Sequence, residues 1–316
     1  MAKNFPTPSL IVILGATATG KTALTIALAK ILNLPVISAD SRQVYQYLDI
    51  GTAKPTLAER QDVPHYMLDV VPPDYNFTVA EYQHQTQALI QQFHAQGVTP
   101  LLVGGTGLYI KAIVDGLIIP QVPPQPELRQ QLASLGQSIC YEMLNQWDPA
   151  TAQKIHPHDQ HRTLRALEVI YTTGKPMSSL QGSVPPPYPI LQIGITQPPH
   201  HIYRQSIHDR LLKMLAQGWL EEIQWLEAKY GADLPLLRTI GYGEMQDYLH
   251  RKLSLAEAIS KAVTSTYQFA KRQRIWFQAD QRTMWISPRL SDLLDLVNNF
   301  KDRQVHPHND TAHHSP

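Results

Sequence analysis

The chain has 316 residues, of which 43% are apolar and 17% are charged, so it is long and apolar enough to bury a sizeable core. Lysine and arginine total 27 against 26 acidic residues, and this balance excludes a general polybasic surface for nucleic acid or membrane. The single cysteine, Cys140, excludes an internal disulfide framework and fits a reducing cytoplasm. The apolar run near the N-terminus is much shorter than a membrane span, so we expect no targeting or transmembrane segment.

Short apolar runs alternate with helical patterns through the first part of the chain. Residues 9–14 are typical of a buried parallel strand, and residues 21–32 follow as a helix. Thr78 and Glu81 have the spacing of a capping box and predict the start of another helix, which Gly97 ends. Further strands are predicted at 35–40, 99–105, 189–196 and 284–288, and further helices near 200–230, 241–250 and 254–278. This alternation predicts an α/β fold, in which a parallel sheet of the P-loop NTPase type is flanked by helices.

Composition changes divide the chain into domains. A proline-rich stretch after Gly116 leads into helical patterns, and a second proline-rich stretch returns to the sheet before 189–196. We therefore predict an all-helical insertion domain that binds RNA at 116–188. The catalytic core is then discontinuous and comprises residues 1–115 and 189–302. Residues 303–316 are polar and rich in histidine, and we expect them to form a disordered tail.

The segment from Gly15 to Thr22, GATATGKT, matches the phosphate-binding pattern G-x-x-x-x-G-K-[ST] between a predicted strand and a predicted helix. Its backbone amides and the helix N-terminus can surround an oxyanion, Lys21 adds a full positive charge, and the Thr22 hydroxyl can hold Mg²⁺. Whether the bound phosphate belongs to ATP stays open. The strand at 99–105 ends in glycines where a metal-binding aspartate for phosphoryl transfer would be expected, although Asp40 could serve instead.

Ligands of parallel α/β sheets bind beyond the carboxyl ends of the strands. Two further segments follow such ends here: ADSRQVY, which contains Asp40, and GGTGLY, which contains Thr106. Asp40 would then lie near the phosphate loop and could accept a proton from an attacking nucleophile. A lone aspartate at a strand end is more often a helix cap or turn former, and the convergence of three segments favours the functional interpretation.

Beyond these segments, the chain resembles a known family. In order behind GATATGKT come DSRQVYQYLDIGTAKP, DVVPPDYNFTVAEY, GGTGLYIKA, RTLRALEVIYTTGKP, IGYGE and FAKRQRIWF. Together they resemble the tRNA dimethylallyltransferases of bacterial type, from about residue 10 to residue 280. The resemblance implies transfer of a dimethylallyl group from dimethylallyl diphosphate to the exocyclic N6 amine of the adenosine 3′ to the anticodon in tRNA.

The resemblance also implies roles for particular residues. Lys21, Asp40 and Thr106 would be catalytic, with Asp40 taking the amine proton and Thr106 touching the target nucleotide. The diphosphate would be held by the loop and a second cation: Gly15, Ala16, Thr17, Ala18, Thr19, Gly20, Lys21, Thr22 and Arg210. Thr22 would be the metal ligand and Mg²⁺ the cofactor, acting on the departing diphosphate.

RNA contact is expected from several sites. The target adenosine must be flipped out of its stacked loop, and loop RNA offers its bases to aromatic and guanidinium planes. The expected contacts are Asp40, Ser41, Arg42, Gln43, Thr106, Arg129, Arg162, Arg165, Lys271, Arg272 and Gln273. Between Arg251 and Arg282 there are seven Lys or Arg and two acidic residues, a local positive excess within the neutral total.

Three positions depart from the family pattern and affect contact with RNA or diphosphate. Ile275 stands where relatives commonly have threonine, Gln278 where arginine is frequent, and Ser206 where many relatives carry arginine.

Three alternatives stay open: an adenylate isopentenyltransferase acting on free AMP, ADP or ATP, an ATP-dependent small-molecule kinase, and a non-enzymatic RNA-binding module. We expect a cytoplasmic monomer, with a tRNA anticodon stem-loop as partner.

Overall fold

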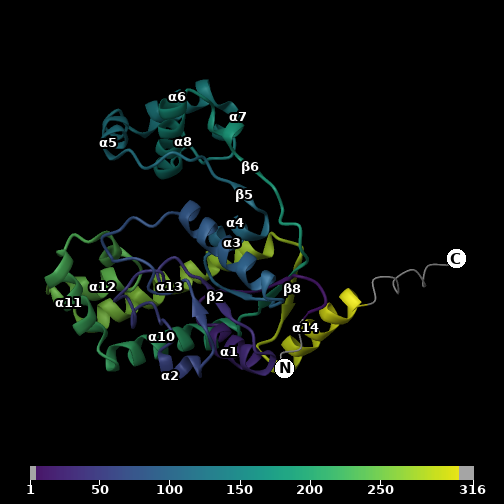
Figure 1. Cartoon of the computed structure of the whole chain (residues 1–316). Helices are drawn as coiled ribbons and strands as arrows, with labels where there is room; N and C mark the ends of the chain where they lie inside the picture. Colours follow the sequence, from purple (N-terminus) through teal and green to yellow (C-terminus); the bar gives the residue numbers. More distant parts are fainter. Residues whose placement is uncertain (1–4, 306–316) are drawn as a thin grey trace. The chain divides into compact units, whose positions relative to one another are not determined.

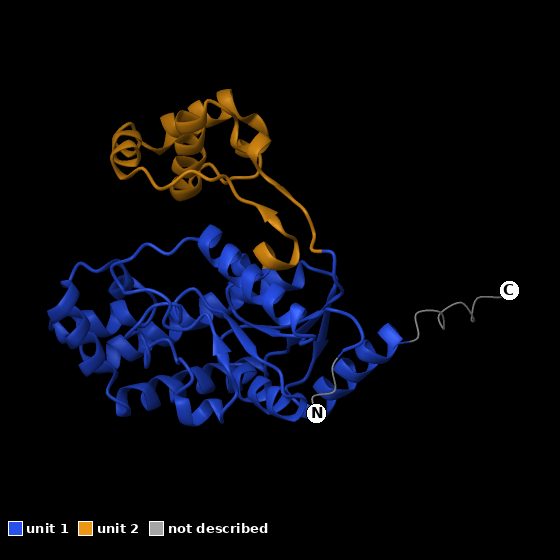
Figure 2. Cartoon of the chain, viewed as in Figure 1, with its two compact units in different colours: residues 1–110, 187–316 blue, residues 111–186 orange. Residues whose placement is uncertain are grey.

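The computed structural model describes residues 5–305 and divides the chain into two compact units (Figure 2). Unit 1 comprises residues 1–110 and 187–316, and unit 2 comprises residues 111–186. The predicted insertion at 116–188 is therefore displaced by a few residues. The difference arises because helix α4 (Gly107–Val114) crosses the boundary, so its last turn belongs to unit 2.

Unit 1 is built on a six-stranded sheet in the order β3-β2-β4-β1-β7-β8, with every neighbouring pair parallel. Its strands are β1 (Leu10–Leu14), β2 (Val36–Ala39), β3 (His65–Tyr66), β4 (Leu101–Gly104), β7 (Ile190–Ile195) and β8 (Thr283–Ile286). Residues of β1 and β2 are fully buried because helices cover both faces of the sheet. The predicted P-loop-type α/β fold is confirmed.

The strand register brings three loops to one edge of the sheet. Leu14 pairs with Gly104, and Gly104 pairs with Ala39, so β1, β4 and β2 end side by side. A Cβ on Gly104 would lie 2.1 Å from the Ala39 carbonyl oxygen, so only glycine permits this approach. The loops that follow these strands consequently start next to one another.

Helices α1 (Lys21–Leu32) and α14 (Leu290–Val305) cover one face of the sheet, whereas α3 (Val79–Ala95) and α4 cover the other (Figure 1). Apolar residues of α1, α14, β1 and β7 form one core cluster that includes Leu28, Ile13, Ile193 and Leu293. Thr78 caps α3 through the predicted capping box with Glu81. The sequence patterns did not predict α14 or the two-residue strand β3.

Unit 1 contains six further helices among the described residues. They are α2 (Leu57–Arg60), α10 (His200–Ala216), α11 (Trp219–Tyr230), the 3₁₀ helix η1 (Pro235–Arg238), α12 (Tyr242–Leu249) and α13 (Leu255–Gln278). The helical stretch predicted near 200–230 is two helices, because Gly218 adopts a left-handed φ of 97° between them. Among residues 5–305, no helix is long and apolar enough to cross a membrane.

Unit 2 consists of five helices and a small two-stranded sheet. Its elements are β5 (Leu117–Ile118), α5 (Pro126–Ser134), α6 (Gln137–Trp147), α7 (Pro149–Ala152), α8 (Gln160–Thr173), α9 (Met177–Leu180) and β6 (Gly182–Ser183). The antiparallel β5–β6 pair joins the two segments by which the chain enters and leaves this unit. Its core includes Leu132, Leu144 and the buried Cys140. The predicted all-helical insertion thus carries one short antiparallel pair.

The expected disordered tail at 303–316 is wrong at its first residues. Helix α14 continues through Val305, and near its end the Gln304 side chain donates to the Ser9 hydroxyl and accepts from the Thr7 hydroxyl. Residues 306–316 lie outside the described residues.

Candidate active site

The phosphate loop connects β1 directly to the N-terminus of α1, as its sequence pattern predicts. Gly20 precedes the helix with a left-handed φ of 81°, and Ala18 also adopts a positive φ of 59°. Within the loop, the Thr19 hydroxyl donates to the Ala16 carbonyl oxygen over 2.9 Å. The Lys21 ammonium donates to the same carbonyl oxygen, so its charge lies inside the curve of the loop.

Thr17 is held by side chains from two distant helices. Its backbone N–H donates to Gln273 Oε1 over 2.9 Å, and its carbonyl oxygen accepts from the Tyr203 hydroxyl. The Arg210 guanidinium donates to its hydroxyl oxygen over 3.2 Å. The expectation that the Thr17 amide binds diphosphate therefore conflicts with this structure, since that N–H already has an acceptor.

Three charges converge around this loop. The pKa of Lys21 is lowered to about 7, mainly by burial and also by the Arg210 charge, while the Asp40 carboxylate acts in the opposite direction. Burial also lowers the pKa of Arg210, and Asp40 again opposes that effect. Asp40 is thus close enough to influence both cations, as expected for the end of β2. The arrangement has two positive groups and one negative group, which leaves it ready to accept an anion.

Asp40 also forms a turn. Its Oδ1 accepts from the Arg42 N–H over 2.8 Å and from the Gln43 N–H over 3.4 Å. This is the turn-forming role that is more common for a lone aspartate at a strand end. Oδ1 is occupied by the turn, which leaves Oδ2 as the oxygen for any proton transfer.

Thr106 joins the ends of β2 and β4. Its Oγ1 accepts from the Ser41 N–H over 3.0 Å and lies 3.4 Å from the Ser41 hydroxyl, while its own N–H donates to the Ala39 carbonyl oxygen. The structure therefore brings the predicted residues Asp40, Ser41 and Thr106 together. We call residues 40–43 and 105–106 the acceptor edge.

A buried framework supports the acceptor edge. Gln43 donates from Nε2 to the carbonyl oxygens of Thr52 and Ala53, and its Oε1 accepts from the Ser38 hydroxyl. Its amide is therefore engaged inside the protein, which conflicts with the predicted RNA contact. Glu222 of α11 then fixes the following turn by accepting from three successive backbone N–H groups, those of residues 49–51.

Lys54 and Tyr242 complete this framework. The Lys54 side chain is 3% exposed, and its ammonium binds Asp49 at 2.6 Å and Asp69 at 2.5 Å. The Tyr242 hydroxyl donates to Glu222 Oε1 over 2.6 Å. Burial raises the pKa of Tyr242 well above its ordinary value, and the Glu222 charge acts in the same direction, so this hydroxyl stays a donor. Sequence reasoning missed Glu222, because its acceptor role depends on a turn that lies far away in the chain.

Gln273 is buried, although it was predicted to contact RNA. Besides accepting from Thr17, its amide donates from Nε2 to the Gly105 carbonyl oxygen over 2.7 Å. A Cβ on Gly105 would lie 2.5 Å from that Nε2, so a larger residue at this position would displace the Gln273 amide. Both ends of the amide are engaged, and the predicted RNA contact through this side chain is replaced by an internal one.

The neighbours of Gln273 on α13 face outward. Lys271, Arg272 and Arg274 are exposed, as the predicted basic surface requires. Trp276 is 43% exposed and lies against Gly107 at the start of α4, whereas Phe277 is buried. The helix thus presents cations and one indole to solvent, and its inward face contacts the phosphate loop.

In unit 2, the predicted RNA-binding arginines have internal partners. The Glu168 side chain has no exposed surface and accepts two hydrogen bonds from Arg129, one from Arg165 and one from the Gln125 N–H. Arg129 and Arg165 therefore neutralise a buried carboxylate, a role that the sequence patterns did not predict, and their contact with RNA stays a prediction. Arg162 is 59% exposed beside Asp159 and keeps its predicted place on the surface.

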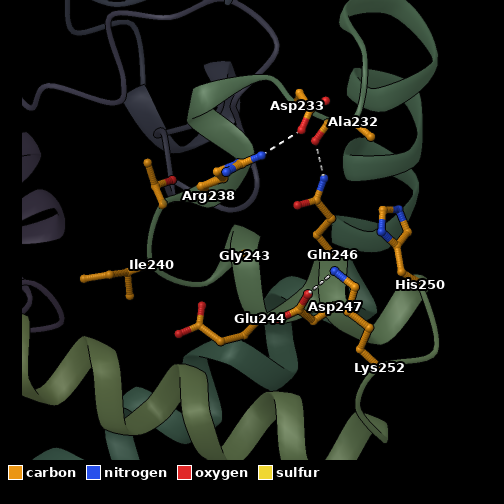
Figure 3. A pocket seen from close by; sticks show the side chains of 11 residues that line it. Ala232, Asp233, Arg238, Ile240, Gly243, Glu244, Gln246, Asp247, His250 and Lys252 are labelled. Atoms are coloured by element: carbon orange, nitrogen blue, oxygen red, sulfur yellow. Dashed lines mark hydrogen bonds and ion pairs between the residues drawn. The ribbon is translucent and has the colours of Figure 1, made fainter. Parts of the chain in front are cut away.

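A cavity of unit 1, of about 580 Å³, lies between η1 and α12 (Figure 3). Ion pairs occupy its wall: Arg238 with Asp233 at 2.7 Å and Lys252 with Asp247 at 3.1 Å. Because these charges neutralise one another in pairs, the cavity lacks the net positive charge of a phosphate site.

The donors present fit Mg²⁺ bound mainly through a phosphate ligand. Within residues 5–305, no group of three or more His, Cys, Asp or Glu side chains could hold a metal ion. Thr22 is exposed at the start of α1, next to the phosphate loop. Mg²⁺ commonly takes one or two protein oxygens and completes its shell with water and substrate phosphates, which suits a single hydroxyl here.

Comparison with known proteins agrees with this geometry. The profile of the IPP transferase family matches residues 43–280. The chain is 57% identical to the tRNA dimethylallyltransferase of Acaryochloris marina, over 95% of this chain and 99% of that protein. It is 58% identical to the enzyme of the same name from Thermosynechococcus vestitus, over 88% and 89% of the two chains.

Solved structures agree as well. The full-length tRNA isopentenylpyrophosphate transferase of Bacillus halodurans is 32% identical, with a TM-score of 0.71 over 95% of this chain and 98% of that chain. A eukaryotic dimethylallyltransferase acting on tRNA has a TM-score of 0.77 at 28% identity, over 95% and 78%. Fold and loop define an α/β protein of the phosphate-loop class with a helical insertion. The chain belongs to the IPP transferase family.

Proposed function

We propose that this chain transfers the dimethylallyl group of dimethylallyl diphosphate to N6 of the adenosine 3′ to the anticodon in tRNA. A bond forms between N6 and C1 of the dimethylallyl group, and the bond between C1 and the diphosphate oxygen breaks. Diphosphate leaves, and the N6 proton passes to a base. The observation that carries the proposal is the meeting of a phosphate loop and the Asp40–Thr106 acceptor edge at one edge of the sheet.

The phosphate loop acts on the leaving group. Allylic diphosphates ionise readily once the charge that develops on the departing diphosphate is neutralised. Lys21 and Arg210 supply positive charge at the loop, and the amides after Thr17 supply donors. This chemistry does not need the metal-binding aspartate of phosphoryl transfer, which agrees with the glycines at the end of β4.

Asp40 serves as the base for the acceptor. The exocyclic amine of adenine is a poor nucleophile because its lone pair is conjugated with the ring, so a positioned base and exact orientation both contribute. Thr106 and Ser41 orient the nucleotide from the other side of the acceptor edge. Mg²⁺, held through Thr22 and the diphosphate, supplies charge neutralisation on the leaving group when bound.

RNA binding involves the exposed cations of α13. Lys271, Arg272 and Arg274 suit phosphate contacts, and Trp276 offers an indole on which a base can stack. Arg42 and Arg162 are further exposed cations among the predicted contacts. We also propose that the chain works as a monomer in the cytoplasm, which size-exclusion chromatography with light scattering and cell fractionation would test.

The decisive experiment supplies the protein with dimethylallyl diphosphate, Mg²⁺ and either an unmodified anticodon stem-loop or AMP. Mass spectrometry of both acceptors should find the prenyl mass on the stem-loop alone. Asp40→Asn should lower single-turnover transfer by about 100- to 10,000-fold, the usual contribution of a general base, and leave stem-loop affinity unchanged. Prenylation of AMP alone, or ATP turnover without a prenyl donor, would contradict the proposal.

A further inference from the structure

We propose that Gln273 is a positioning residue, which fixes the phosphate loop relative to the acceptor edge through the two ends of its side-chain amide. The inference rests on the proposed prenyl transfer. It replaces the expected role of Gln273 as an RNA contact with a role in the chemical step. The evidence is its burial, the direction of its hydrogen bonds and the two elements that they join.

The two hydrogen bonds of Gln273 are complementary. Oε1 accepts from the Thr17 N–H at 2.9 Å, and Nε2 donates to the Gly105 carbonyl oxygen at 2.7 Å. Thr17 belongs to the loop assigned to the leaving group, and Gly105 directly precedes Thr106 of the acceptor edge. One amide thus spans both halves of the reaction centre.

Among residues 5–305, no backbone–backbone hydrogen bond joins these two loops. The pairing of strands β1 and β4 ends at Leu14 with Gly104. Beyond that point, Gln273 forms a direct polar link between Thr17 and Gly105. The residue is 8% exposed, so water competes little for either hydrogen bond.

Prenyl transfer depends on the distance between the phosphate loop and the acceptor edge. N6, C1 and the leaving oxygen must lie nearly in line, with the reacting atoms about 3 to 3.5 Å apart, and a misplacement of about 1 Å can lower the rate about 100-fold. Removing Gln273 leaves a donor and an acceptor unpaired and releases one loop from the other. The rate of prenyl transfer at saturating substrates should therefore fall. The affinity for RNA should stay unchanged, because it depends on exposed cations.

The test compares Gln273→Ala and Gln273→Met with wild type and with Gln268→Ala, which removes an exposed glutamine from the same helix. Methionine keeps the length of the side chain and fills the same space, which guards against collapse of the site. Single-turnover transfer to the stem-loop is measured at saturating donor and RNA. Stem-loop Kd and thermal melting are measured alongside.

We expect both Gln273 variants to lose about 10- to 100-fold in saturated rate, with stem-loop Kd within about twofold of wild type and Gln268→Ala unaffected. A weakened Kd with an unchanged saturated rate would restore the role in RNA contact and overturn the inference. Full activity of Gln273→Met would also overturn it, because packing alone would then suffice. Absence of transfer in wild type and Gln268→Ala would instead contradict the proposed function.

Discussion

The charge state of Lys21 predicts how diphosphate affinity depends on pH. Burial and the Arg210 charge lower the pKa of Lys21 to about 7. A bound diphosphate brings negative charge beside the ammonium and favours its protonated form. The free protein must therefore take up a proton at Lys21 to bind tightly, and affinity falls as pH rises through 7.

The magnitude follows from the protonated fraction. With a pKa of about 7, Lys21 is about 76% protonated at about pH 6.5 and about 3% protonated at about pH 8.5. If only the protonated form binds well, this lysine alone weakens affinity about 25-fold across that interval. At about pH 8 the complex should take up about 0.9 proton from the buffer.

Titration calorimetry with inorganic diphosphate and Mg²⁺ measures both quantities, with proton uptake obtained from buffers of different ionisation enthalpy. Lys21→Arg is the matched control, because a guanidinium stays protonated throughout and the ligand's own ionisation cancels in the ratio of the two affinities. We expect the wild-type-to-variant affinity ratio to fall about 25-fold from about pH 6.5 to about pH 8.5. A ratio that stays constant, without proton uptake, would refute the reasoning.

Four further predictions concern residues outside the phosphate loop. Glu168→Ala should destabilise unit 2 by about 3 kcal/mol, because it removes the carboxylate partner of two arginines. Faster hydrogen exchange of the backbone amides in α8 would measure this loss of stability. Burial opposes ionisation of Glu168, but hydrogen bonds from Arg129, Gln125 and Arg165 lower its pKa, so the stability it provides should be lost as pH falls below 4.5. Glu222→Ala leaves three backbone N–H groups without their acceptor and should cost about 2 to 3 kcal/mol and slow transfer, whereas the exposed Glu221→Ala should change neither melting nor rate. Arg272→Ala should weaken stem-loop binding and reduce the slope of log Kd against log salt by about one, and an equal effect of Lys261→Ala on the same helix would argue against a local contact.

Several features of the site were predictable because they are local in the chain. The strand, loop and helix around GATATGKT need only an apolar run, two glycines and a helix pattern within about two dozen residues. The capping boxes of α3 and α13 are likewise complete within four residues. Even the meeting of Asp40 and Thr106 followed from the rule that parallel strands end at one edge.

For other residues the structure shows internal partners that were not predicted, because a residue type does not specify its partner. Arginines in the helical insertion suggested RNA, but Arg129 and Arg165 are paired with a glutamate that α8 buries. Gln43 and Gln273 have uncharged amides that can bind RNA or a backbone equally well, and in the folded chain both bind backbone carbonyl groups. Tyr203 and Arg210 lie seven residues apart, so helical periodicity places them on one face of α10, and both contact Thr17. Of these two residues, only Arg210 was predicted to belong to the site.

The sequence by itself determined the fold class, the phosphate loop and the segments that follow β2 and β4, because each depends on periodicity or on spacing within a short segment. Only the tertiary structure decided which groups are already occupied. Gln273 reaches Thr17 across 256 positions and Gly105 across 168, and Glu222 reaches Asp49 across 173. Such contacts depend on how whole helices pack against the sheet, and that packing is set by the summed burial of many apolar side chains. The residues that hold the two halves of the site together are therefore visible only once the chain is folded.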